Sequence, residues 1–498
     1  MDPLFEIEIE LPAKGSRDAA RSLFEQLKSA IVDGRLVADA KLPPTRRSAE
    51  FLGVSRNTAS EIYDRLLHDG YVVTRHGAGT YVASTLPTQP SMRERTRDAG
   101  PPDSRLNPFW LREDVTQAMG FWRDRAVVEP TRARGSAIDF RPALVDSRLF
   151  PFDVFRRVSA KQLRGLERKP ARFKSPQGNQ GNFHLREAIS RHIALTRAVV
   201  CQPDDIVVTA GAQQAFDLLA RILVKPNETV VAVEDPGYPP MRVPFAAAGA
   251  KIVPVGVDDE GLIVEQLPAD VGVICVCPSH QFPLGVTMSA RRRKTLLAFA
   301  RERGAVVVED DYDGEFRYGP TSLDALRTSA AVDVVFYVGT FSKCMLPALR
   351  LGFIVAPQWA MRTLVAAKNG LDWHCPVPVQ LGVAAFMAEG HLAHHVRTMR
   401  SIYQRRRQLL LNLLREEFAD SLAPVDSFYG MHLSAFARTQ ADLESLAEAL
   451  LEQGVKVHTL DRYYVGTQRR SGLIFGYGAV DLTEIRRGMN SLFRTLTS

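Results

Sequence analysis

The sequence from Ala137 onward contains short apolar runs that recur at intervals and alternate with segments of helical character. The runs have three to seven residues and are rich in Val and Ile, which is typical of strands that are buried on both faces of a sheet. Amphipathic segments lie between several of them, for example Gln213–Leu223 and Arg291–Arg303. The alternation predicts an α/β domain from Ala137 onward, with a largely parallel sheet covered by helices on both sides. The runs are Ile206–Thr209, Val230–Val233, Val271–Cys277, Val306–Val308 and Val334–Val338.

The pattern changes after about Pro378. Long helical segments come first, and β-prone runs follow near Met431–Ala437 and Leu473–Tyr477. This order predicts a smaller α+β subdomain at the end of the chain.

Composition is that of a globular protein, with 45% hydrophobic and 24% charged residues among 498. Five cysteines are too few, and odd in number, for a disulfide framework, which favours a reducing compartment. Four acidic residues among the first ten exclude the positive start of a signal peptide. The most apolar stretch, Trp373–Ala388, is interrupted by Pro376 and Pro378. We therefore expect a soluble, cytoplasmic protein that does not interact with membranes.

The first 83 residues have the pattern of a small helical module followed by a hairpin. Helical spacing covers Arg17–Asp33, Thr45 is expected to cap a helix through Leu52, and Ser55 a third helix that ends at Gly70. Two β-prone runs, Tyr71–Val73 and Gly79–Val82, then flank a turn. Two short helices joined by a tight turn and followed by a hairpin predict a winged helix-turn-helix, whereas helix spacing alone would equally fit a three-helix packing module.

The start of the third predicted helix carries residues suited to reading DNA. In a helix-turn-helix this end of the second helix meets base edges, and flanking residues contact phosphates. Arg and Asn make bidentate contacts with guanine and adenine. Because the segment 1–83 holds 11 basic and 12 acidic residues, the placement of its arginines matters more than the net charge of +7. The candidate DNA-binding residues are Arg46, Arg47, Ser55, Arg56, Asn57, Thr58, Arg75 and His76.

The run LPPTRRSAEFLGVSRNTASEIYDRLLHDGYVVTRHGAGTYV resembles the winged helix-turn-helix of GntR-family regulators along its whole length. One departure lies at Ala38–Ala40, where the family usually has a glycine. The resemblance implies a double-stranded DNA operator as partner.

Residues 84–136 are rich in proline and weak in apolar periodicity, which predicts a linker. The pairs Phe109-Trp110 and Phe121-Trp122 are unusual in a linker, because aromatic side chains of this size normally pack against a folded surface. They either dock on a neighbouring domain or subunit or belong to the first helix of the large domain. The predicted domains are therefore 1–83, which binds DNA, a linker over 84–136, and the large domain over 137–498.

Four polar segments follow predicted strands of the large domain, at the edge where such sheets bind ligands. They are Thr209–Gln213, Glu234–Tyr238, Glu309–Tyr312 and Gly339–Lys343, with Arg350 seven residues further on. Each segment alone is weak evidence for a ligand site, because a Ser-Lys pair after a strand usually lies in a solvated loop and an Asp there is often a helix cap. Together they contain what pyridoxal phosphate requires: a lysine for the Schiff base and an acid for the pyridinium nitrogen.

We assign Lys343 to the Schiff base, which makes it the catalytic residue, Asp310 to the ring nitrogen and Tyr312 to the phenolic oxygen. Hydroxyl groups, a guanidinium group and helix-start amides can hold the phosphate. These phosphate contacts are assigned to Thr340, Ser342, Arg350 and the backbone amides of Gly211, Ala212 and Gln213.

Residues 137–498 resemble a fold-type I aminotransferase domain. The motifs PSHQFPLG, EDDYDGEF and GTFSKCMLPALRLGF are similar to those of MocR/GabR-type regulators, which are GntR-family proteins fused to such a domain. The resemblance implies that Tyr238 lines the cofactor pocket and that the chain forms a homodimer. Phe282 stands where aminotransferases usually carry an Asn that bonds the phenolic oxygen; His280 or Gln281 is expected to replace it.

An effector carboxylate normally pairs with an arginine. Family position points to Arg462, with Arg242 and Arg470 as rivals, although each also fits a surface arginine. His391, His394 and His395 have helical spacing, but no carboxylate or cysteine obviously completes a metal site, so we expect a solvated helix face and no metal.

The predicted function is a transcriptional regulator that senses an amino compound by aldimine exchange at Lys343. The first alternative is a working aminotransferase with an appended DNA-binding head, because the chemistry-bearing residues are retained. The second is a DNA-binding protein whose large domain only dimerises. Phe282 speaks against efficient transamination, and the intact Asp310, Tyr312 and Lys343 speak against the dimeriser.

Overall fold

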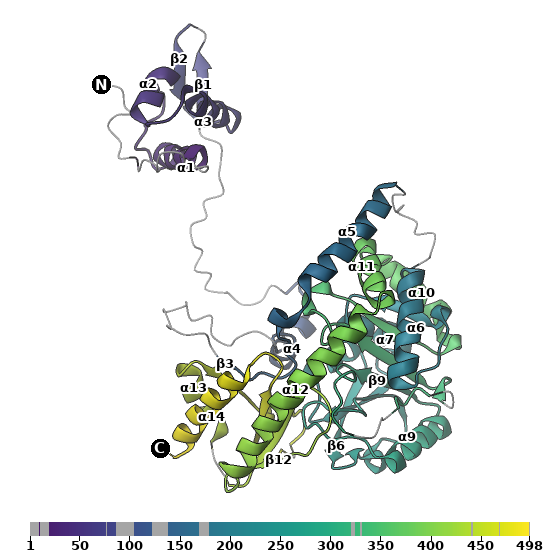
Figure 1. The fold of residues 1–498 in the computed structure, drawn as a ribbon. Coiled ribbons are helices and arrows are strands. Elements are labelled where there is room, and N and C mark those ends of the chain that lie inside the picture. Colours follow the sequence, from purple (N-terminus) through teal and green to yellow (C-terminus); the bar gives the residue numbers. More distant parts are fainter. Residues whose placement is uncertain are drawn as a thin grey trace. The chain divides into compact units, whose positions relative to one another are not determined.

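The structure is a computed structural model, and its chain divides into two compact units, Met1–Pro102 and Asp103–Ser498 (Figure 1). The residues that the structure describes are 9, 19–75, 77–85, 104–121, 138–168, 179–319, 324–328, 331–439, 442–467 and 469–497.

The first unit contains three helices and one hairpin. The helices are α1 (Ala19–Val32), α2 (Thr45–Phe51) and α3 (Arg56–His68). Strands β1 (Val72–Arg75) and β2 (Gly79–Val82) pair in antiparallel fashion to form the wing. The helices enclose an apolar core that includes Leu23, Leu27, Ile62 and Leu66, each at most 1% exposed. This is the winged helix-turn-helix that the sequence predicts.

The two predicted helix caps have different outcomes. The hydroxyl of Ser55 accepts a hydrogen bond from the backbone N–H of Thr58 at 3.1 Å, so Ser55 caps α3. The prediction for Thr45 is wrong, because Pro44 occupies the position before α2 and Thr45 is already helical. A proline there fixes the backbone without supplying a side-chain acceptor.

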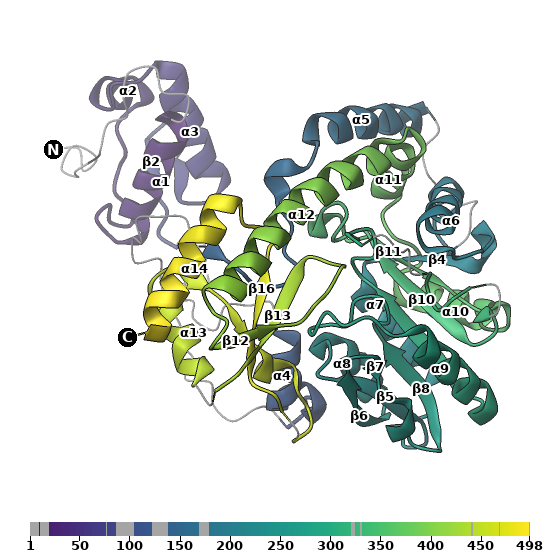
Figure 2. The ribbon, with the colours of Figure 1, turned by 60° about the horizontal axis from the view of Figure 1, so that its bottom comes forward.

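The second unit is built on an eight-stranded sheet in the order β4-β11-β10-β9-β8-β5-β6-β7 (Figure 2). The neighbouring pairs from β10 to β6 are parallel, whereas β11 and β7 run antiparallel to their neighbours. This mixed but largely parallel sheet confirms the predicted α/β class. The strands are β4 (Ile206–Thr209), β5 (Val230–Asp235), β6 (Lys251–Asp258), β7 (Gly261–Leu262), β8 (Val271–Val276), β9 (Val306–Asp311), β10 (Val335–Thr340) and β11 (Gly352–Val355).

Both faces of this sheet are covered, because alternate residues of each strand belong to different apolar clusters. Val231, Val273 and Val308 pack with residues of α7 (Ala212–Leu223), α8 (Pro239–Ala247) and α10 (Gln358–Asp372). On the opposite face, Ala232, Ile274 and Val307 pack with residues of α9 (Ala290–Arg303). Residues of β4 and β11 on that face pack with α6 (Phe183–Arg197), α11 (Val377–Ala388) and α12 (His391–Glu416), and α11 also contacts α5 (Phe152–Arg168).

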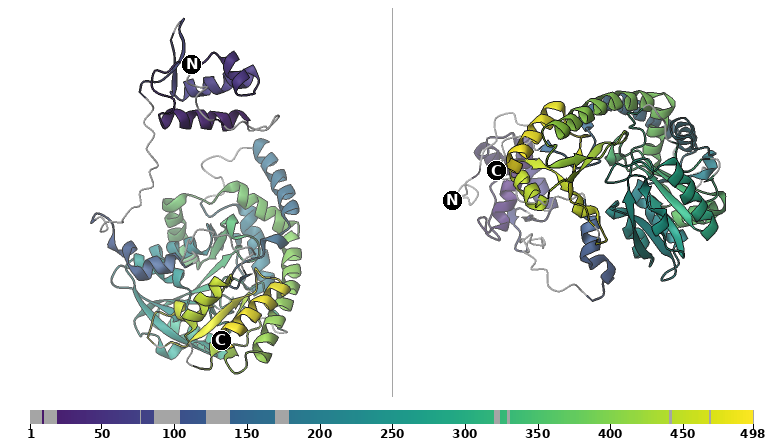
Figure 3. Two further views of the ribbon diagram at one scale, coloured as in Figure 1. Left: turned by 90° about the vertical axis from the view of Figure 1, so that its left-hand side faces the viewer. Right: turned by 90° about the horizontal axis from the view of Figure 1, so that it is seen from below.

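A second, four-stranded antiparallel sheet forms the small subdomain, in the order β12-β13-β16-β15. Its strands are drawn in yellow-green to yellow in Figure 3. Its strands are β12 (Leu422–Pro424), β13 (His432–Ala437), β15 (His458–Thr459) and β16 (Gly472–Gly476). Two helices, α13 (Leu443–Glu452) and α14 (Leu482–Thr497), belong to this part, where β14 (Val455–Lys456) also pairs with β3 (Ile138–Asp139). The predicted α+β subdomain is therefore present.

The segment 104–121 lies within the predicted linker and is docked on the large unit. A 3₁₀ helix, Pro108–Leu111, leads into α4 (Glu113–Met119), which packs on α8 through Val115, Ala118 and Val243. Phe121 is 4% exposed and makes an edge contact with Tyr238. The segment belongs to the second unit, Asp103–Ser498, which agrees with the alternative that these aromatic residues lie at the start of the large domain. Trp110 remains half exposed, and Trp122 lies outside the described residues.

Three remaining sequence predictions concern membranes, cysteines and histidines. Within the described parts of the chain, no helix is long and apolar enough to cross a bilayer. All five cysteines are free thiols. His391 and His394 lie on α12 with His395, but His395 is 5% exposed and its ring packs against Phe150, so the predicted solvated face does not include it.

Candidate functional site

The carboxyl ends of the parallel strands open into one cavity of about 480 Å³. The cavity brings together nine of the sequence-predicted cofactor residues, which come from five segments of the chain. They are Ala212, Gln213, Tyr238, Asp310, Tyr312, Thr340, Ser342, Lys343 and Arg350. The other lining residues are Met119, Arg141, Ala143, Leu144, Pro240, Phe282 and Pro347.

Lys343 lies in the turn after β10, where its side chain faces the cavity. Its Nζ atom donates a hydrogen bond to the backbone carbonyl of Ala143 at 2.7 Å. Burial lowers the pKa of Lys343 to about 8, although the nearby carboxyl groups of Asp313 and Asp310 partly oppose this shift. A lysine with a lowered pKa is more often in the neutral, nucleophilic form that attacks a carbonyl carbon.

Asp310 lies near the end of β9, on the strand next to the one that precedes Lys343. Burial raises the pKa of its carboxyl group to about 8, and the neighbouring Asp311 and Asp313 act in the same direction. Its Oδ1 atom is buried and has no hydrogen-bond partner among the described residues. A buried carboxyl oxygen of this kind is ready to accept a hydrogen bond from a ligand in the cavity.

One side of the cavity is formed by the start of α7 and the turn after β10. The guanidinium of Arg350 donates to the carbonyl of Ala210 at 3.0 Å, just before the helix starts. Gly211 has a φ of +80°, and a Cβ atom there would come within 2.9 Å of Nη2 of Arg350. Thr340 and Ser342 share a 3.0 Å hydrogen bond between their hydroxyl groups. The arrangement offers two hydroxyls, a guanidinium and helix-start amides to an anion.

His280 does not line the cavity and lies behind Tyr312 instead. The hydroxyl of Tyr312 is 2.8 Å from Nδ1 of His280 and 3.0 Å from the His280 carbonyl, to which it donates. The same Nδ1 atom lies 3.0 Å from Oδ2 of Asp313. His280 therefore contacts Tyr312 from behind and does not itself reach the cavity.

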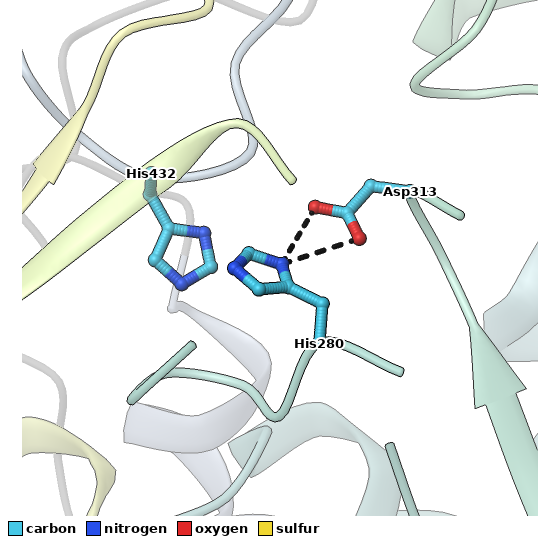
Figure 4. Close-up of side chains that lie close together, drawn as sticks. All are labelled: His280, Asp313 and His432. Atoms are coloured by element: carbon cyan, nitrogen blue, oxygen red, sulfur yellow. Dashed lines mark hydrogen bonds and ion pairs between the residues drawn. The ribbon is translucent and has the colours of Figure 1, made fainter. Parts of the chain in front are cut away.

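His432 of β13 lies against the far side of the His280 ring (Figure 4). The ligand atoms of His280, Asp313 and His432 lie within 4.8 Å of one another, which is close enough for a metal site. Figure 4 shows, however, that Asp313 and His432 flank opposite edges of the His280 ring, so the three side chains form a chain rather than converging on one point. Sequence reasoning missed Asp313 and His432, although Asp313 lies within the EDDYDGEF motif.

A second buried carboxyl group, that of Glu234, lies close to Asp310. Its Oε2 atom accepts hydrogen bonds from the backbone N–H of Cys277 at 3.0 Å and from Nε2 of Gln281 at 3.4 Å. Burial raises the pKa of Glu234 to about 8. Gln281 is thereby engaged with Glu234 and with the carbonyl of Pro236, so it does not take the place of the missing Asn beside Tyr312.

The cavity wall also includes residues that sequence reasoning did not single out. Arg141, Ala143 and Leu144 come from the chain that leads into α5, and Met119 comes from α4. No periodicity or motif marked them, because their place depends on how the start of the large unit crosses the sheet edge.

The candidate effector arginines lie elsewhere. Arg242 and Arg462 line a second cavity, of about 520 Å³, together with Arg469 and residues of α4. Neither belongs to the lining of the cavity that contains Lys343. The guanidinium of Arg470 lies 3.5 Å from the centre of the Phe436 ring, in a cation–π contact.

The candidate DNA-binding residues are mostly exposed. Arg46, Arg47, Arg56 and Asn57 are exposed, and Thr58 is half-buried with its hydroxyl 2.8 Å from that of Ser55. Arg75 of the wing forms an ion pair with Asp39 and lies over the Tyr81 ring. His76 lies outside the described residues. The start of α3 therefore presents side chains that suit base edges, and the wing presents a cation.

The cavity fits pyridoxal 5′-phosphate. It pairs a lysine of lowered pKa with a buried carboxyl oxygen that lacks a partner among the described residues, and Gly211 leaves space beside Arg350. A DNA-binding winged helix-turn-helix joined to a fold-type I, aminotransferase-like domain defines a class of transcriptional regulators.

Comparisons with known proteins agree with this class. The model of bacterial regulatory proteins of the gntR family matches residues 19–82, and that of class I and II aminotransferases matches residues 149–487. The probable rhizopine catabolism regulatory protein MocR of Rhizobium meliloti is 35% identical, over 95% of this chain and 92% of its own length. The pyridoxine biosynthesis regulator PdxR of Corynebacterium glutamicum is 30% identical, over 93% of each chain. The solved structure of LysN, an α-aminoadipate aminotransferase from Thermus thermophilus, matches 72% of this chain and 92% of its own, with 28% identity and a TM-score of 0.66.

The chain thus belongs to the MocR-type regulators of the GntR family and to the class I and II aminotransferase family. It is a transcriptional regulator of this type, with pyridoxal 5′-phosphate as the cofactor of its large domain.

Proposed function

We propose that this regulator senses an amino compound at Lys343 and changes its binding to DNA in response. The observation that carries the proposal is that Lys343, Asp310 and Arg350 line one cavity in a chain that also contains a winged helix-turn-helix. The bound cofactor supplies an aldehyde carbon that an amine of the effector can occupy in place of the lysine.

Each residue of the cavity has a proposed task. Asp310 holds a proton at the cofactor's ring nitrogen, because its buried Oδ1 atom lacks another partner among the described residues. Tyr312, supported by His280, faces the phenolic oxygen, and Tyr238 forms part of the wall. The phosphate is held by Thr340, Ser342, Arg350 and the segment Gly211–Gln213. Lys343 is the residue that the effector displaces.

Displacement of Lys343 offers a route for the signal. The free lysine donates to the carbonyl of Ala143, in the segment that leads into α5, so a lysine released from the cofactor can make this contact between two distant parts of the chain. A ligand shifts a conformational equilibrium only when it favours one state, and this contact differs between the two states.

For the DNA side, we propose that residues 1–83 bind the operator through Arg46, Arg47, Ser55–Thr58, Arg75 and His76. A homodimer would then present two such heads to two half-sites. The cytoplasm is the proposed location, where the five free thiols remain reduced.

The identity of the effector does not follow from the relatives, because the names of MocR and PdxR refer to different compounds. Arg462 and Arg242 remain proposed effector contacts. That role requires their segment to move toward the cavity of Lys343, since they line the neighbouring one.

The experiment that tests the proposal combines two measurements on the full chain loaded with cofactor. Amino compounds are screened for a change in the cofactor's absorption spectrum, and those that change it are tested for an effect on DNA affinity. Compounds that do both support a sensor. Sustained release of keto acid with many amines would instead support the alternative, an aminotransferase with a DNA-binding head.

A further inference from the structure

The second cavity, of about 520 Å³, is separated from the cavity of Lys343 by a thin wall. Neighbouring residues divide the two: Met119 and Pro240 line the first, whereas Ala118 and Pro239 line the second. The end of α4 and the start of α8 therefore form the wall between them. A cavity of this volume is large enough for a small organic molecule.

Arg242 of α8 contributes a guanidinium group to this second cavity. Its side chain is partly buried, yet it forms no hydrogen bond and no ion pair with any of the described residues. Burial lowers the pKa of Arg242, although the carboxyl groups of Asp114 and Asp235 oppose this shift. A cation that has lost part of its hydration and has no partner in the chain is suited to pair with an anion from outside.

The two acidic side chains near Arg242 are already engaged with other donors. The carboxyl group of Asp114 accepts from Nε and Nη2 of Arg112, at 3.0 and 2.8 Å. That of Asp235 accepts from the backbone N–H groups of residues 465 and 466, at 2.7 and 3.0 Å. The guanidinium group of Arg242 therefore remains available to a ligand in the cavity.

The charges and apolar groups of the lining indicate the class of ligand. Three guanidinium groups and two carboxyl groups line the cavity, so the excess of one positive charge suits a ligand with a single negative charge. A guanidinium group binds a carboxylate through two parallel hydrogen bonds. The remaining wall is partly apolar, which suits a hydrocarbon ring or chain. The charged groups are Arg242, Arg462, Arg469, Asp114 and Asp461, and the apolar ones include Phe121, Pro239 and Val465.

We propose that this second cavity is a separate binding site for a small monocarboxylate, with Arg242 as its principal contact. The inference goes beyond the proposed function, because the carboxylate is a second ligand that does not reach Lys343. Arg242 contacts it in the position that the structure shows, whereas contact with an amino compound at Lys343 requires a movement. The bound carboxylate also lies against α4, whose Met119 lines the cavity of Lys343.

The first test titrates the cofactor-loaded full chain with benzoate, cyclohexanecarboxylate and hexanoate, and with the corresponding amides as neutral ligands of the same shape. None of these carboxylates has an amino group, so none can displace Lys343 from the cofactor. Isothermal titration calorimetry should show that at least one carboxylate binds tenfold or more tightly than its amide, as expected for a charge-assisted contact. Equal binding of acids and amides, or no binding of any acid, would overturn the proposal.

The second test replaces the arginine. Arg242→Gln should weaken binding of the preferred carboxylate by roughly tenfold, and Arg242→Lys, which retains the charge, should weaken it less. Because Arg242 bonds to no described residue, we expect both variants to fold, which circular dichroism checks. Arg221→Gln on α7 is the matched control, because Arg221 is an exposed arginine that pairs with Asp217 outside the cavity. Wild-type affinity in Arg242→Gln would refute the site.

The third test locates the bound carboxylate by hydrogen exchange and mass spectrometry. Exchange should become slower in α4 and in the 3₁₀ helix Leu460–Tyr463, which carries Asp461 and Arg462, while the absorption spectrum of the cofactor stays unchanged. Slower exchange confined to residues 339–343, or a shifted cofactor spectrum, would place the carboxylate in the cavity of Lys343 and contradict the proposal.

Two outcomes separate this inference from the proposed function. If Arg242→Gln weakens the spectral response to amino compounds but binds the carboxylate normally, Arg242 serves the site of Lys343 and only the second site fails. If the wild type takes up no cofactor, the proposed function fails, whereas the same titrations on the cofactor-free chain still decide whether the carboxylate binds at Arg242.

Discussion

Nζ of Lys343 lies 2.7 Å from the backbone carbonyl oxygen of Ala143, although the two residues are 200 positions apart in the sequence. Arg141 and Leu144, on either side of Ala143, also line the cavity of Lys343. The beginning of the large unit thus forms one wall of the cavity that contains Lys343. A group that bonds to Nζ of Lys343 removes the hydrogen bond to this wall. We therefore expect the wall to change its position when a ligand binds.

Lys343→Ala should abolish the covalent attachment of the cofactor, because no other lysine lines the cavity within the described residues. Borohydride reduction followed by peptide mass spectrometry measures the attachment site. The wild type should carry the cofactor on the peptide that contains Lys343. Equal labelling of the variant, or labelling of a different peptide, would refute the assignment.

Asp310→Asn should weaken the pH dependence of stability in the cofactor-free chain. Burial raises the pKa of Asp310 from the usual carboxyl range to about 8, so between about pH 4 and pH 8 the folded state binds more protons than the unfolded state. The contribution of Asp310 to stability therefore falls as the pH rises through this window. Melting temperatures between pH 5 and pH 8 should decline less in the variant than in the wild type.

Asp310→Asn should reduce the decline of the melting temperature with rising pH but should not remove it. Glu234, with a pKa raised to about 8, and Glu309, with a pKa raised to about 7, are also buried carboxyls that titrate in this window. Stability that declines as steeply in Asp310→Asn as in the wild type would contradict the assignment. The same variant should also bind the cofactor more weakly, since it cannot supply a carboxylate to the ring nitrogen.

Gly211→Ala should weaken cofactor binding by roughly tenfold, about the effect of one lost charge-assisted hydrogen bond. The new Cβ atom would lie 2.9 Å from Nη2 of Arg350, and the φ of +80° also disfavours alanine. Gly165→Ala on α5 is the control, because a Cβ atom there meets no atom within 4 Å. Fluorescence titration with pyridoxal 5′-phosphate measures both, and equal affinities would show that Gly211 is not part of the phosphate site.

Sequence patterns predicted the fold well where local rules determine it. The start of β4 and the ends of α7 and α9 coincide with the predicted positions, because uninterrupted Val and Ile runs and amphipathic spacing are local signals. The strand-end motifs likewise predicted that Lys343, Asp310 and Tyr312 would lie near one another, and the structure brings them into one cavity. Thr45 failed as a cap because Pro44 had already fixed the backbone of that position.

Other parts of the site depend on contacts that no local pattern encodes. His432 meets His280 only because the small sheet lies against the loop after β8, and Ala143 meets Lys343 only through the path of the chain before α5. The placement of Arg462 was inferred from family position, whereas in the structure it lines the neighbouring cavity with Arg242. Periodicity and motif spacing carry no information about long-range packing of this kind.

Arg56→Ala should weaken binding to a DNA duplex that the wild type selects from random sequences. Arg56 is exposed at the start of α3, where a base contact is worth about 1 to 3 kcal/mol. Arg21→Ala, an exposed arginine of α1 outside the proposed contacts, is the control. Fluorescence anisotropy at several salt concentrations measures both. A variant that lost affinity for all sequences equally would indicate a phosphate contact instead of base reading.

Ser55→Ala should destabilise α3 by about 1 kcal/mol, because the hydroxyl of Ser55 accepts from the N–H of Thr58. Hydrogen exchange of α3 in the full chain should become faster by roughly fivefold. Ser55→Asp retains an acceptor at the same position and should leave the exchange close to wild type. Unchanged exchange in Ser55→Ala would show that the cap contributes nothing to this helix.

The most direct test of the account is the DNA affinity of the cofactor-loaded chain, measured with and without an amino compound that changes its absorption spectrum. The account predicts that the compound changes both the spectrum and the affinity in the wild type, and that Lys343→Ala abolishes the effect on affinity. A compound that changes the spectrum while the DNA affinity stays constant, or that acts equally on Lys343→Ala, would contradict it.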